Sequence, residues 1–327
     1  MMNNRATMLS YPSIVFFGTP AFAAGILDHI LTTGIPVRGV VTAPDKPAGR
    51  GRKPQPPPVK QYAADKGIPL LQPERLKDPL FLEALQAWEP ALQVVVAFRM
   101  LPEAVWALPP LGTFNLHASL LPRYRGAAPI QHVLMNGEKE TGVTTFFIDD
   151  KIDTGGIIMQ KKIPVSPEDN AGTLTEKLMR AGAALVVDTI HAIIRGEVQP
   201  VRQEHLAKGP LVTAPKIRRE DMEIDWRKSS SEIYNHIRAF SPHPGARTTI
   251  CDKNGKSYLF KIFSARPVRE EHTHTVPSFV TDGKNFLNVA VSDGYLSLEE
   301  VQLEGRKRMN VRDFLRGFRP GEFTFSA

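Results

Sequence analysis

An asparagine and a histidine two residues apart could stabilise a negatively charged oxygen and transfer a proton. Asn115 and His117 belong to one run of the chain in which apolar residues alternate with them. If this run is a strand, both side chains point to the same face, because side chains alternate along a strand. A carboxamide can donate a hydrogen bond to a developing oxyanion, and an imidazole can move a proton. Pro122 and Gly126 then turn the chain, so the pair is predicted to lie at the mouth of a loop, where open α/β sheets bind their ligands.

This pair needs a carboxylate that holds the histidine ring, and three aspartates are candidates. Asp149, Asp150 and Asp153 follow a predicted strand at residues 142–148. Asp153 opens an Asp-Thr-Gly-Gly turn that could return its carboxylate to the edge of the same sheet. An aspartate before glycine also forms turns for structural reasons alone. The spacing does not choose among the three.

Hydrolytic and metal chemistry fit the sequence less well than direct transfer. Ser119 lies two residues from His117 without a G-x-S-x-G motif, which argues against a serine hydrolase. The single cysteine, Cys251, and the nine histidines show no metal-ligand spacing, so no metal is expected. Direct attack of an amine on a bound carbonyl needs neither a nucleophilic side chain nor a metal. In that reaction Asn115 and His117 would hold the tetrahedral oxygen while an aspartate assists proton removal.

The elements that position these residues are predicted in the first 195 residues. An apolar strand at 13–17, a helix at 21–31 and a strand at 37–41 form a βαβ unit, which is typical of a parallel sheet. Residues 94–98 have the pattern of a fully buried strand, and residues 171–195 that of a long amphipathic helix. We therefore predict an α/β fold, with a Rossmann-like, mostly parallel sheet in a catalytic domain at residues 1–195.

The pattern changes after this domain. Residues 196–215 carry several prolines and little hydrophobic periodicity, and are predicted to be a linker. Short strand-like runs then recur about every ten residues, separated by Asn-Gly and Asp-Gly turns, which favours a small β-barrel. We predict an OB-like barrel at residues 216–327.

A basic loop is predicted at residues 43–58. Lys46, Arg50, Arg52 and Lys53 stand within eight residues, among prolines and glycines that argue against any regular element. The chain has a net charge of +7, and a polyanionic partner is consistent with that excess. We interpret the loop as a phosphate-binding segment.

Composition excludes several classes of protein. No run of 18 apolar residues occurs, so no membrane span is expected. The polar first residues do not resemble a signal peptide, and a lone cysteine suits a reducing compartment. We expect a cytoplasmic protein, and a monomer.

Several motifs together resemble the signature of the folate-dependent formyltransferases. They are Asn-Leu-His-Ala-Ser-Leu-Leu-Pro at residues 115–122, Arg-Gly-Ala-Ala-Pro at 125–129, Thr-Gly-Val-Thr at 141–144 and Asp-Thr-Gly at 153–155. The resemblance covers nearly the whole chain. Phe-Gly-Thr-Pro at 17–20, Pro-Asp-Lys-Pro-Ala-Gly-Arg-Gly at 44–51 and Ile-Asp-Trp at 224–226 make the chain most similar to members that act on a charged tRNA.

The resemblance implies a reaction and a set of residues. The reaction is transfer of the formyl group of 10-formyltetrahydrofolate, the co-substrate, to the α-amino group of initiator methionyl-tRNA. The catalytic residues implied are Asn115, His117 and, among the three aspartates, Asp153. The segment Ser119, Leu120, Leu121, Pro122 is implied to contact folate. The basic loop, with Arg50 above all and Lys46, Arg52 and Lys53 beside it, and the C-terminal domain are implied to contact tRNA. One departure is Phe98 and Arg99, where the family pattern has tyrosine and glycine beside the folate pocket.

Three other functions are weighed against this one. A formyltransferase for a small amine, such as glycinamide ribonucleotide or an amino sugar nucleotide, shares the chemistry but has no need of a basic loop and a β-rich C-terminal part. A non-catalytic RNA-binding protein has no use for Asn115, His117 and Asp153 together. A nicotinamide oxidoreductase is disfavoured because the glycine fingerprint is missing.

Overall fold

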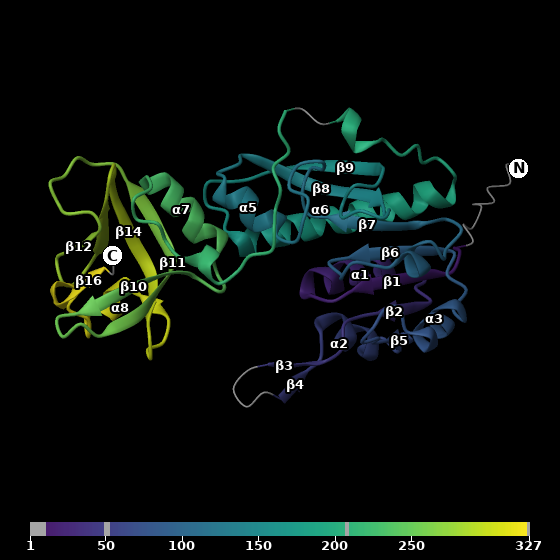
Figure 1. Cartoon of the computed structure of the whole chain (residues 1–327), viewed down its shortest axis with the longest axis horizontal. Helices are drawn as coiled ribbons and strands as arrows, with labels where there is room; N and C mark the ends of the chain where they lie inside the picture. Colours follow the sequence, from purple (N-terminus) through teal and green to yellow (C-terminus); the bar gives the residue numbers. More distant parts are fainter. Residues whose placement is uncertain (1–10, 49–52, 207–208, 326–327) are drawn as a thin grey trace, which may run out of the picture. The chain divides into compact units, whose positions relative to one another are not determined.

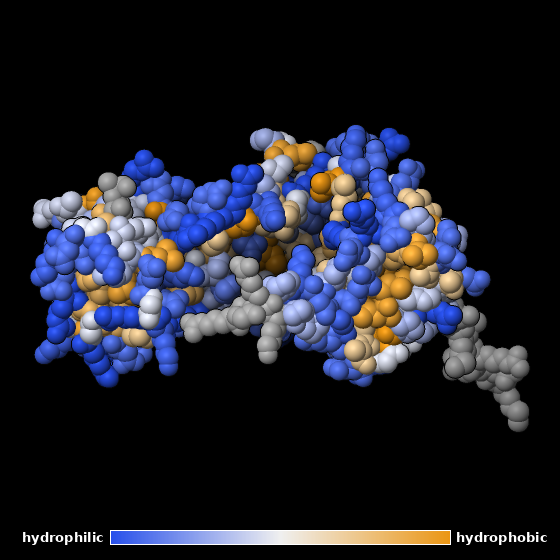
Figure 2. All heavy atoms as spheres, turned by 60° about the horizontal axis from the view of Figure 1, so that its bottom comes forward, coloured by the Kyte–Doolittle hydropathy of each residue, from blue (hydrophilic) through white to orange (hydrophobic). Residues whose placement is uncertain are grey.

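The computed structural model describes residues 11–48, 53–206 and 209–325, and within them the chain forms two compact units. The first unit contains residues 1–126, 142–163 and 176–213. The second contains residues 127–141, 164–175 and 214–327. The second unit thus includes two segments from the range predicted as the catalytic domain, and the domain boundaries at 195 and 216 stay a prediction. Hydrophilic residues cover most of the face in Figure 2, with hydrophobic residues in smaller patches.

A seven-stranded sheet forms the centre of the first unit. Its strand order is β5-β2-β1-β6-β7-β8-β9, which can be followed in Figure 1. The neighbours from β5 to β7 pair in parallel, and β8 pairs antiparallel with β7. The strands are β1 (Ile14–Gly18), β2 (Gly39–Val41), β5 (Leu70–Leu71), β6 (Leu92–Val96), β7 (Thr113–His117), β8 (Glu140–Phe147) and β9 (Ile157–Pro164). The predicted Rossmann-like, mostly parallel sheet is confirmed.

Helices cover both faces of this sheet, which is why every residue of β1 and β6 is buried and Gln93 is the one polar side chain among them. On one face Leu116 of β7 packs against Gly182, where a Cβ would come within 2.7 Å of the leucine. On the other face Val95 of β6 belongs to a core cluster with residues of α3 and α4. The helices with residues in this unit are α1 (Ala21–Thr32), α2 (Pro58–Asp65), α3 (Pro79–Gln86), α4 (Glu103–Trp106) and most of α6 (Ala171–Ile194), with a 3-10 turn η1 (Gln203–His205).

The basic segment contains two short strands, β3 (Lys46–Ala48) and β4 (Lys53–Gln55). This corrects the expectation that prolines and glycines would prevent any regular element at residues 43–58. The two strands pair only with each other within the described residues, and Pro47 lies opposite Pro54. Proline has no N–H to donate, so neither of these two residues can donate a hydrogen bond to the opposite strand. The backbone is extended there without being bound into the main sheet.

The second unit contains an antiparallel sheet in the order β12-β13-β14-β11-β10-β16, with β15 beside β14. Its strands are β10 (Ala246–Asp252), β11 (Ser257–Val268), β12 (Ser278–Thr281), β13 (Leu287–Val291), β14 (Gly294–Leu303), β15 (Met309–Asn310) and β16 (Phe323–Phe325). The two outer strands approach each other through Phe279 of β12 and Phe325 of β16, whose rings lie 4.5 Å apart. The sheet is therefore a nearly closed barrel, as the strand spacing predicted.

Aromatic side chains fill the barrel. Phe260, Phe314 and Phe318 are fully buried, and their ring centroids lie 4.4 to 6.3 Å apart. Such clusters bury large apolar area and add specific ring contacts. The remaining elements of this unit are α5 (Pro129–Met135), η2 (Glu220–Met222), α7 (Ser230–Ala239), α8 (Val311–Leu315) and η3 (Pro320–Glu322).

Side-chain hydrogen bonds bind the early segments of the chain to this second unit. The buried guanidinium of Arg238 on α7 donates to the carbonyls of Ser166 and Asp169, both at 3.1 Å. The ring of His132 on α5 contacts the carbonyl of Pro215 at 3.1 Å. The residues around α5 and those just before α6 are thereby part of the C-terminal unit, although the first unit precedes and follows them in the sequence.

Candidate active site

Strand β7 lies between β6 and β8 and carries the candidate pair at its carboxyl end. Asn115 is in register with Val95 of β6 and Phe146 of β8, and His117 with Thr144 of β8. Asn115 therefore lies on the face of the sheet that Val95 shares with α3 and α4, and His117 follows it on that face. The strand alternation inferred from the sequence is confirmed. Central strands are rigid, so the two side chains are held in fixed relative positions.

The turn after β7 accepts a hydrogen bond from His117. The buried ring places Nε2 2.8 Å from the backbone carbonyl oxygen of Tyr124. A carbonyl only accepts hydrogen bonds, so Nε2 carries the proton and donates it. This contact orients the ring and leaves Nδ1 as the nitrogen that faces the candidate carboxylate.

Asp153 is the aspartate that the fold brings to His117. Its Oδ2 lies 3.7 Å from Nδ1 of His117 and accepts a hydrogen bond of 2.9 Å from the backbone N–H of Gly126. The side chains of His117 and Asp153 are only 7% and 13% exposed, which weakens screening of their interaction by water. Asp149 instead accepts hydrogen bonds from the backbone of Lys151 and the hydroxyl of Thr154, so it supports the turn.

The Asp-Thr-Gly-Gly turn requires glycine at position 155. A Cβ on Gly155 would lie 1.7 Å from the carbonyl oxygen of Phe147, at the end of β8. This close approach draws the turn against the end of β8, and from that turn the carboxylate of Asp153 reaches the ring of His117. The turn signal in the sequence allowed this return of the carboxylate but did not choose Asp153 over Asp149 and Asp150.

Three residues around the site have left-handed backbone conformations. Ala97, Tyr124 and Asp153 have φ of 46°, 62° and 55°. A non-glycine residue with such a φ costs about 1–2 kcal/mol and persists only where its surroundings hold it. Ala97 directly follows β6, the carbonyl of Tyr124 accepts a hydrogen bond from His117, and the carboxylate of Asp153 faces the His117 ring. Strain of this kind gathers at sites where geometry is fixed for function.

The carboxamide of Asn115 is half-buried and makes no hydrogen bond within the part of the chain that the structure describes. A carboxamide offers two donors and one acceptor oxygen. On the same strand face as His117, it is available to a ligand at the carboxyl end of β7.

The segment predicted to contact folate continues directly from this strand. Ser119, Leu121 and Pro122 are buried, whereas Leu120 is half-buried. The hydroxyl of Ser119 donates to the carbonyl of Arg123 at 2.7 Å, and the hydroxyl of Thr144 donates to the carbonyl of Ser119 at 2.7 Å. The main chain of Leu121 is also bound, because its N–H donates to the Thr144 hydroxyl and its carbonyl accepts from the Gln160 amide, so β8 and β9 fix the segment beside the site. Leu120 is the one residue of this segment that is not fully buried, and the contact of the segment with folate stays a prediction.

The predicted basic residues lie on or near the β3–β4 pair. Lys46 is exposed on β3, and Lys53 begins β4. Arg50 and Arg52 lie outside the described residues. The base of the segment is anchored by Asp45, whose carboxylate accepts hydrogen bonds from Lys60 at 2.8 and 2.9 Å and from Gln72 at 2.9 Å. These bonds, that of Lys60 first, lower the pKa of the Asp45 carboxyl below its ordinary value.

Phe98 and Arg99 follow β6 at the same end of the sheet. The Phe98 ring meets that of Phe17 in β1 edge-on, at 5.6 Å. The Arg99 guanidinium donates to the carbonyl of Glu74 at 2.7 Å and to that of Pro73, both beyond β5. The departure from the family pattern thus has a structural consequence, because Arg99 connects loops at the carboxyl ends of β6 and β5.

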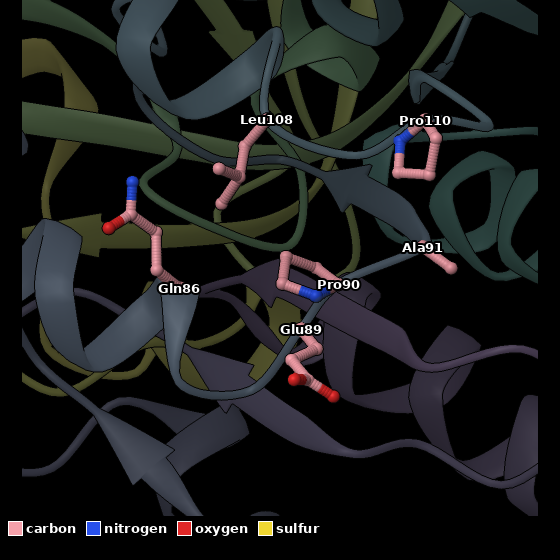
Figure 3. A pocket seen from close by; sticks show the side chains of 6 residues that line it. All are labelled: Gln86, Glu89, Pro90, Ala91, Leu108 and Pro110. Carbon is pink, nitrogen blue, oxygen red and sulfur yellow. The ribbon is translucent and has the colours of Figure 1, made fainter.

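A surface hollow lies at the opposite end of the strands. Gln86, Glu89, Pro90, Ala91, Leu108 and Pro110 line it (Figure 3). Pro90 and Ala91 precede β6, and Leu108 and Pro110 precede β7. Ligands of open α/β sheets bind at the carboxyl ends of the strands, so this hollow does not belong to the candidate site.

Two further properties concern the described residues only. They contain no group of three or more histidine, cysteine, aspartate or glutamate side chains that could hold a metal ion. Within the same ranges, no helix combines the length and the apolar character needed to cross a membrane.

Sequence reasoning missed three contributors to the site. Tyr124 acts through its carbonyl, which no side-chain pattern reveals. Gly126 stood in a recognised motif, but its contact with Asp153 was not foreseen. Gln203, in the predicted linker, donates hydrogen bonds to the carbonyls of Asp153 and Gly155. It lies 50 positions from Asp153, so no local signal could have identified it.

Comparison with known proteins identifies the relatives of this chain. A formyl transferase family model matches residues 13–190, and the model of the formyl transferase C-terminal domain matches residues 216–319. The chain is 51% identical to the methionyl-tRNA formyltransferase of Bacteroides fragilis over 306 residues, which are 93% of this chain and 94% of that protein. It is 53% identical to the methionyl-tRNA formyltransferase of Azobacteroides pseudotrichonymphae over 309 residues, which are 93% and 95% of the two chains.

Among solved structures, HypX from Aquifex aeolicus in complex with tetrahydrofolic acid is similar in fold. The TM-score is 0.63 at 17% sequence identity, over 94% of this chain and 47% of that one.

Proposed function

This chain belongs to the formyl transferase family, and within it to the methionyl-tRNA formyltransferases. From that premise we propose that it transfers the formyl group of 10-formyltetrahydrofolate to the α-amino group of initiator methionyl-tRNA. The products are formylmethionyl-tRNA for translation initiation and tetrahydrofolate. We place the reaction in the cytoplasm and expect a monomer to perform it.

The proposed reaction is direct transfer. The α-amino nitrogen attacks the formyl carbon, an N–C bond forms, and the carbonyl electron pair moves onto oxygen. Asn115, whose carboxamide has no hydrogen-bond partner in the described part of the chain, donates to that oxygen. His117 stabilises the same oxygen from the same strand face. The bond from the formyl carbon to N10 then breaks.

Proton transfer balances this reaction. The attacking amine loses one proton, and the departing N10 gains one. Asp153 assists the transfer, because its carboxylate lies beside Nδ1 of His117 and is held by the N–H of Gly126. Since Nε2 of His117 is committed to the Tyr124 carbonyl, Nδ1 is the ring atom that exchanges a proton in this scheme.

The two substrates are assigned to different parts of the chain. The folate co-substrate would lie along residues 119–122, beside the carboxyl end of β7. Its assignment is supported by the family and by the tetrahydrofolic acid in the HypX structure, a protein of similar fold. The tRNA would meet Lys46, Arg50, Arg52 and Lys53, and the C-terminal unit. Phosphate contacts by such cations supply salt-dependent affinity.

The observation that carries this proposal is the assembly of Asn115, His117 and Asp153 at the carboxyl end of one central strand, with His117 and Asp153 held by backbone groups. A binding module without catalysis gains nothing from that arrangement. The single turn between β1 and α1 also lacks the glycines that a nicotinamide dinucleotide needs.

The test is formyl transfer from 10-formyltetrahydrofolate to charged initiator methionyl-tRNA, with charged elongator methionyl-tRNA as the matched control. We expect transfer to the initiator, with much slower transfer to the elongator. A glycinamide ribonucleotide and an amino sugar nucleotide serve as small-amine acceptors. Transfer to one of these, with none to either tRNA, would overturn the proposed acceptor and leave the formyl chemistry in place.

A further inference from the structure

The buried side chain of Gln203 uses its full hydrogen-bonding capacity next to the proposed catalytic aspartate. Gln203 is 2% exposed. Its Nε2 donates to the backbone carbonyls of Asp153 and Gly155, both at 2.9 Å. Its Oε1 accepts from Nε and Nη2 of Arg125, at 3.0 and 2.7 Å. A primary amide has two N–H donors and one acceptor oxygen, so no group is left unpaired.

These four hydrogen bonds connect the two turns that hold the Asp153 carboxylate, namely the turn that contains Asp153 and the turn that contains Arg125 and Gly126. The backbone of Asp153 lies in the left-handed region, and Gln203 binds that backbone directly. The carboxylate itself accepts from Gly126, and Arg125, the residue before Gly126, donates to the same glutamine. Gln203 therefore joins the Asp153 turn to the turn that orients His117.

Backbone contacts hold the surrounding segment in place as well. Val201 exchanges backbone hydrogen bonds of 2.8 Å with Ile157 of β9, and the carbonyl of Val212 accepts from the N–H of Tyr124 at 2.6 Å. The residues on both sides of η1 are thus bound to the first unit. Gln203 is presented to Asp153 from a fixed backbone rather than from a free connector.

We propose that Gln203 is a positioning residue for the formyl transfer. It holds the strained Asp153 turn and the Arg125–Gly126 turn in the one arrangement that places the carboxylate beside Nδ1 of His117. This inference rests on the proposed function, because it assigns Gln203 its effect through Asp153. Gln203 touches neither substrate in this proposal.

The amide group is the chemical requirement of this position. Two carbonyls need donors on one side, and a guanidinium needs an acceptor on the other. A carboxylate of the same size keeps the contact with Arg125 but sets an oxygen against two carbonyl oxygens. A methionine of similar length fills the space and removes all four hydrogen bonds.

The test compares Gln203→Met and Gln203→Glu with the unchanged chain. We expect kcat to fall about tenfold to a hundredfold in both variants, because small misplacement of a catalytic group has effects of that size. We expect KM for the formyl donor and for the charged tRNA to change by less than about twofold. Thermal unfolding measures the fraction of each variant that is folded, and kcat is calculated per folded molecule. If Gln203→Met does not fold, Gln203→Glu still tests the proposal.

Gln93→Met is the matched control. Gln93 is also fully buried in the first unit and is hydrogen-bonded, to Thr113 at 3.0 Å, but it lies near the amino end of β6, away from the site. Its replacement removes a buried amide nitrogen that has no partner among the described residues, and is expected to leave kcat of the folded protein unchanged. An equal loss of kcat in Gln93→Met would show that Gln203 acts only by supporting the fold, and would overturn the proposal.

A double-mutant cycle separates positioning from general support. If Gln203 acts through Asp153, then Gln203→Met added to Asp153→Asn causes no further loss of kcat. A full multiplicative loss in the double variant would overturn the proposal.

Hydrogen exchange of the Gly126 amide tests the same inference without catalysis. This amide donates to Asp153, so its exchange is expected to quicken at least about tenfold in Gln203→Met and to stay unchanged in Gln93→Met. If the unchanged chain formylates no tRNA and exchange still quickens, the proposed function fails while the role of Gln203 in holding Asp153 stands. Unchanged exchange overturns that role.

Discussion

Two regions of the first unit illustrate two ways of holding functional residues. At the carboxyl end of β7, His117 and Asp153 are buried, and each is bound by the backbone of another turn. The β3–β4 segment pairs only with itself among the described residues and has prolines opposite each other. It is attached at its base through Asp45, Lys60 and Gln72.

The difference corresponds to the demands on each region. Stabilising a transition state requires groups fixed within fractions of an ångström, so strain and burial are acceptable costs there. Recognition of a large polyanion requires charge more than exact placement, because phosphate contacts are long-ranged and individually replaceable. We therefore expect changes at the β7 end to lower kcat and changes in the β3–β4 segment to raise KM for tRNA.

The largest effect is expected from the residues that we propose to be catalytic. Replacing His117 by alanine, or Asp153 by asparagine, should lower kcat by about 10² to 10⁴-fold, the usual contribution of general acid–base groups. Binding of charged tRNA should stay within about twofold, because neither residue belongs to the basic segment. Single-turnover formyl transfer and tRNA binding measure the two quantities, with His29→Ala on α1 as the control. Turnover close to that of the unchanged chain in either variant would refute the assigned roles.

The next effect concerns the turn that returns Asp153 to the site. In Gly155→Ala the new Cβ would lie 1.7 Å from the Phe147 carbonyl oxygen, so the turn must move away from β8. We expect a loss of about 3 kcal/mol or more in the free energy of unfolding, together with a large fall in kcat. Chemical denaturation and kinetics measure both.

Gly67→Ala is the control for this substitution. Gly67 has a φ of 65° with open space around its missing Cβ, so alanine there tests left-handed strain without a clash. We expect a loss of only about 1 kcal/mol and unchanged kcat. Equal stability losses in the two variants would show that the close approach at Gly155 does not hold the turn.

The hydrophobic pattern of the sequence was sufficient to predict the parallel sheet of the first unit and the barrel of the second. Apolar runs such as residues 14–17 in β1 and 94–96 in β6 have the pattern of a covered parallel sheet, and short strands with glycine turns indicated the barrel. The β3–β4 pair was not predicted, because its prolines argue against strands by propensity. Extended backbone at residues 46–48 and 53–55 is nevertheless compatible with the φ that proline imposes.

The candidate site was predictable only where one strand or one motif carried it. Alternation placed Asn115 and His117 on one face, and resemblance, not spacing, selected Asp153 among three aspartates. The carbonyl of Tyr124 and the amide of Gln203 carry no local signal, because backbone groups are present at every position and Gln203 lies in a segment without periodicity. Contacts formed by the folded chain between distant segments are what sequence patterns leave out.

A smaller effect is expected from the basic segment. Arg50→Ala should raise KM for initiator tRNA severalfold and lower the slope of log affinity against log salt by about one, as for the loss of one phosphate contact. The KM for the formyl donor and kcat at saturating tRNA should not change. Titrations at several salt concentrations measure this. An unchanged salt slope together with a lowered kcat would mean that Arg50 acts at the reacting groups, and the contrast between the two regions would fail.

The smallest effect tests whether the base of that segment matters for tRNA binding. Asp45→Asn removes the charge of the carboxylate that accepts from Lys60 and Gln72, and both Asp45 and Lys60 are about 30% exposed. Pairs with that exposure are worth up to about 1 kcal/mol, so KM for tRNA should rise no more than about fivefold, with kcat unchanged. Lys60→Met should have the same effect, and the double variant should add nothing, because both changes remove one contact.

Asp28→Asn, which alters the contact with Tyr62 between α1 and α2, is the control. A fall in kcat in Asp45→Asn would show that the base of the β3–β4 segment is coupled to the residues at the carboxyl end of β7. The proposed catalytic region and the proposed tRNA-binding segment would then not be independent in this protein.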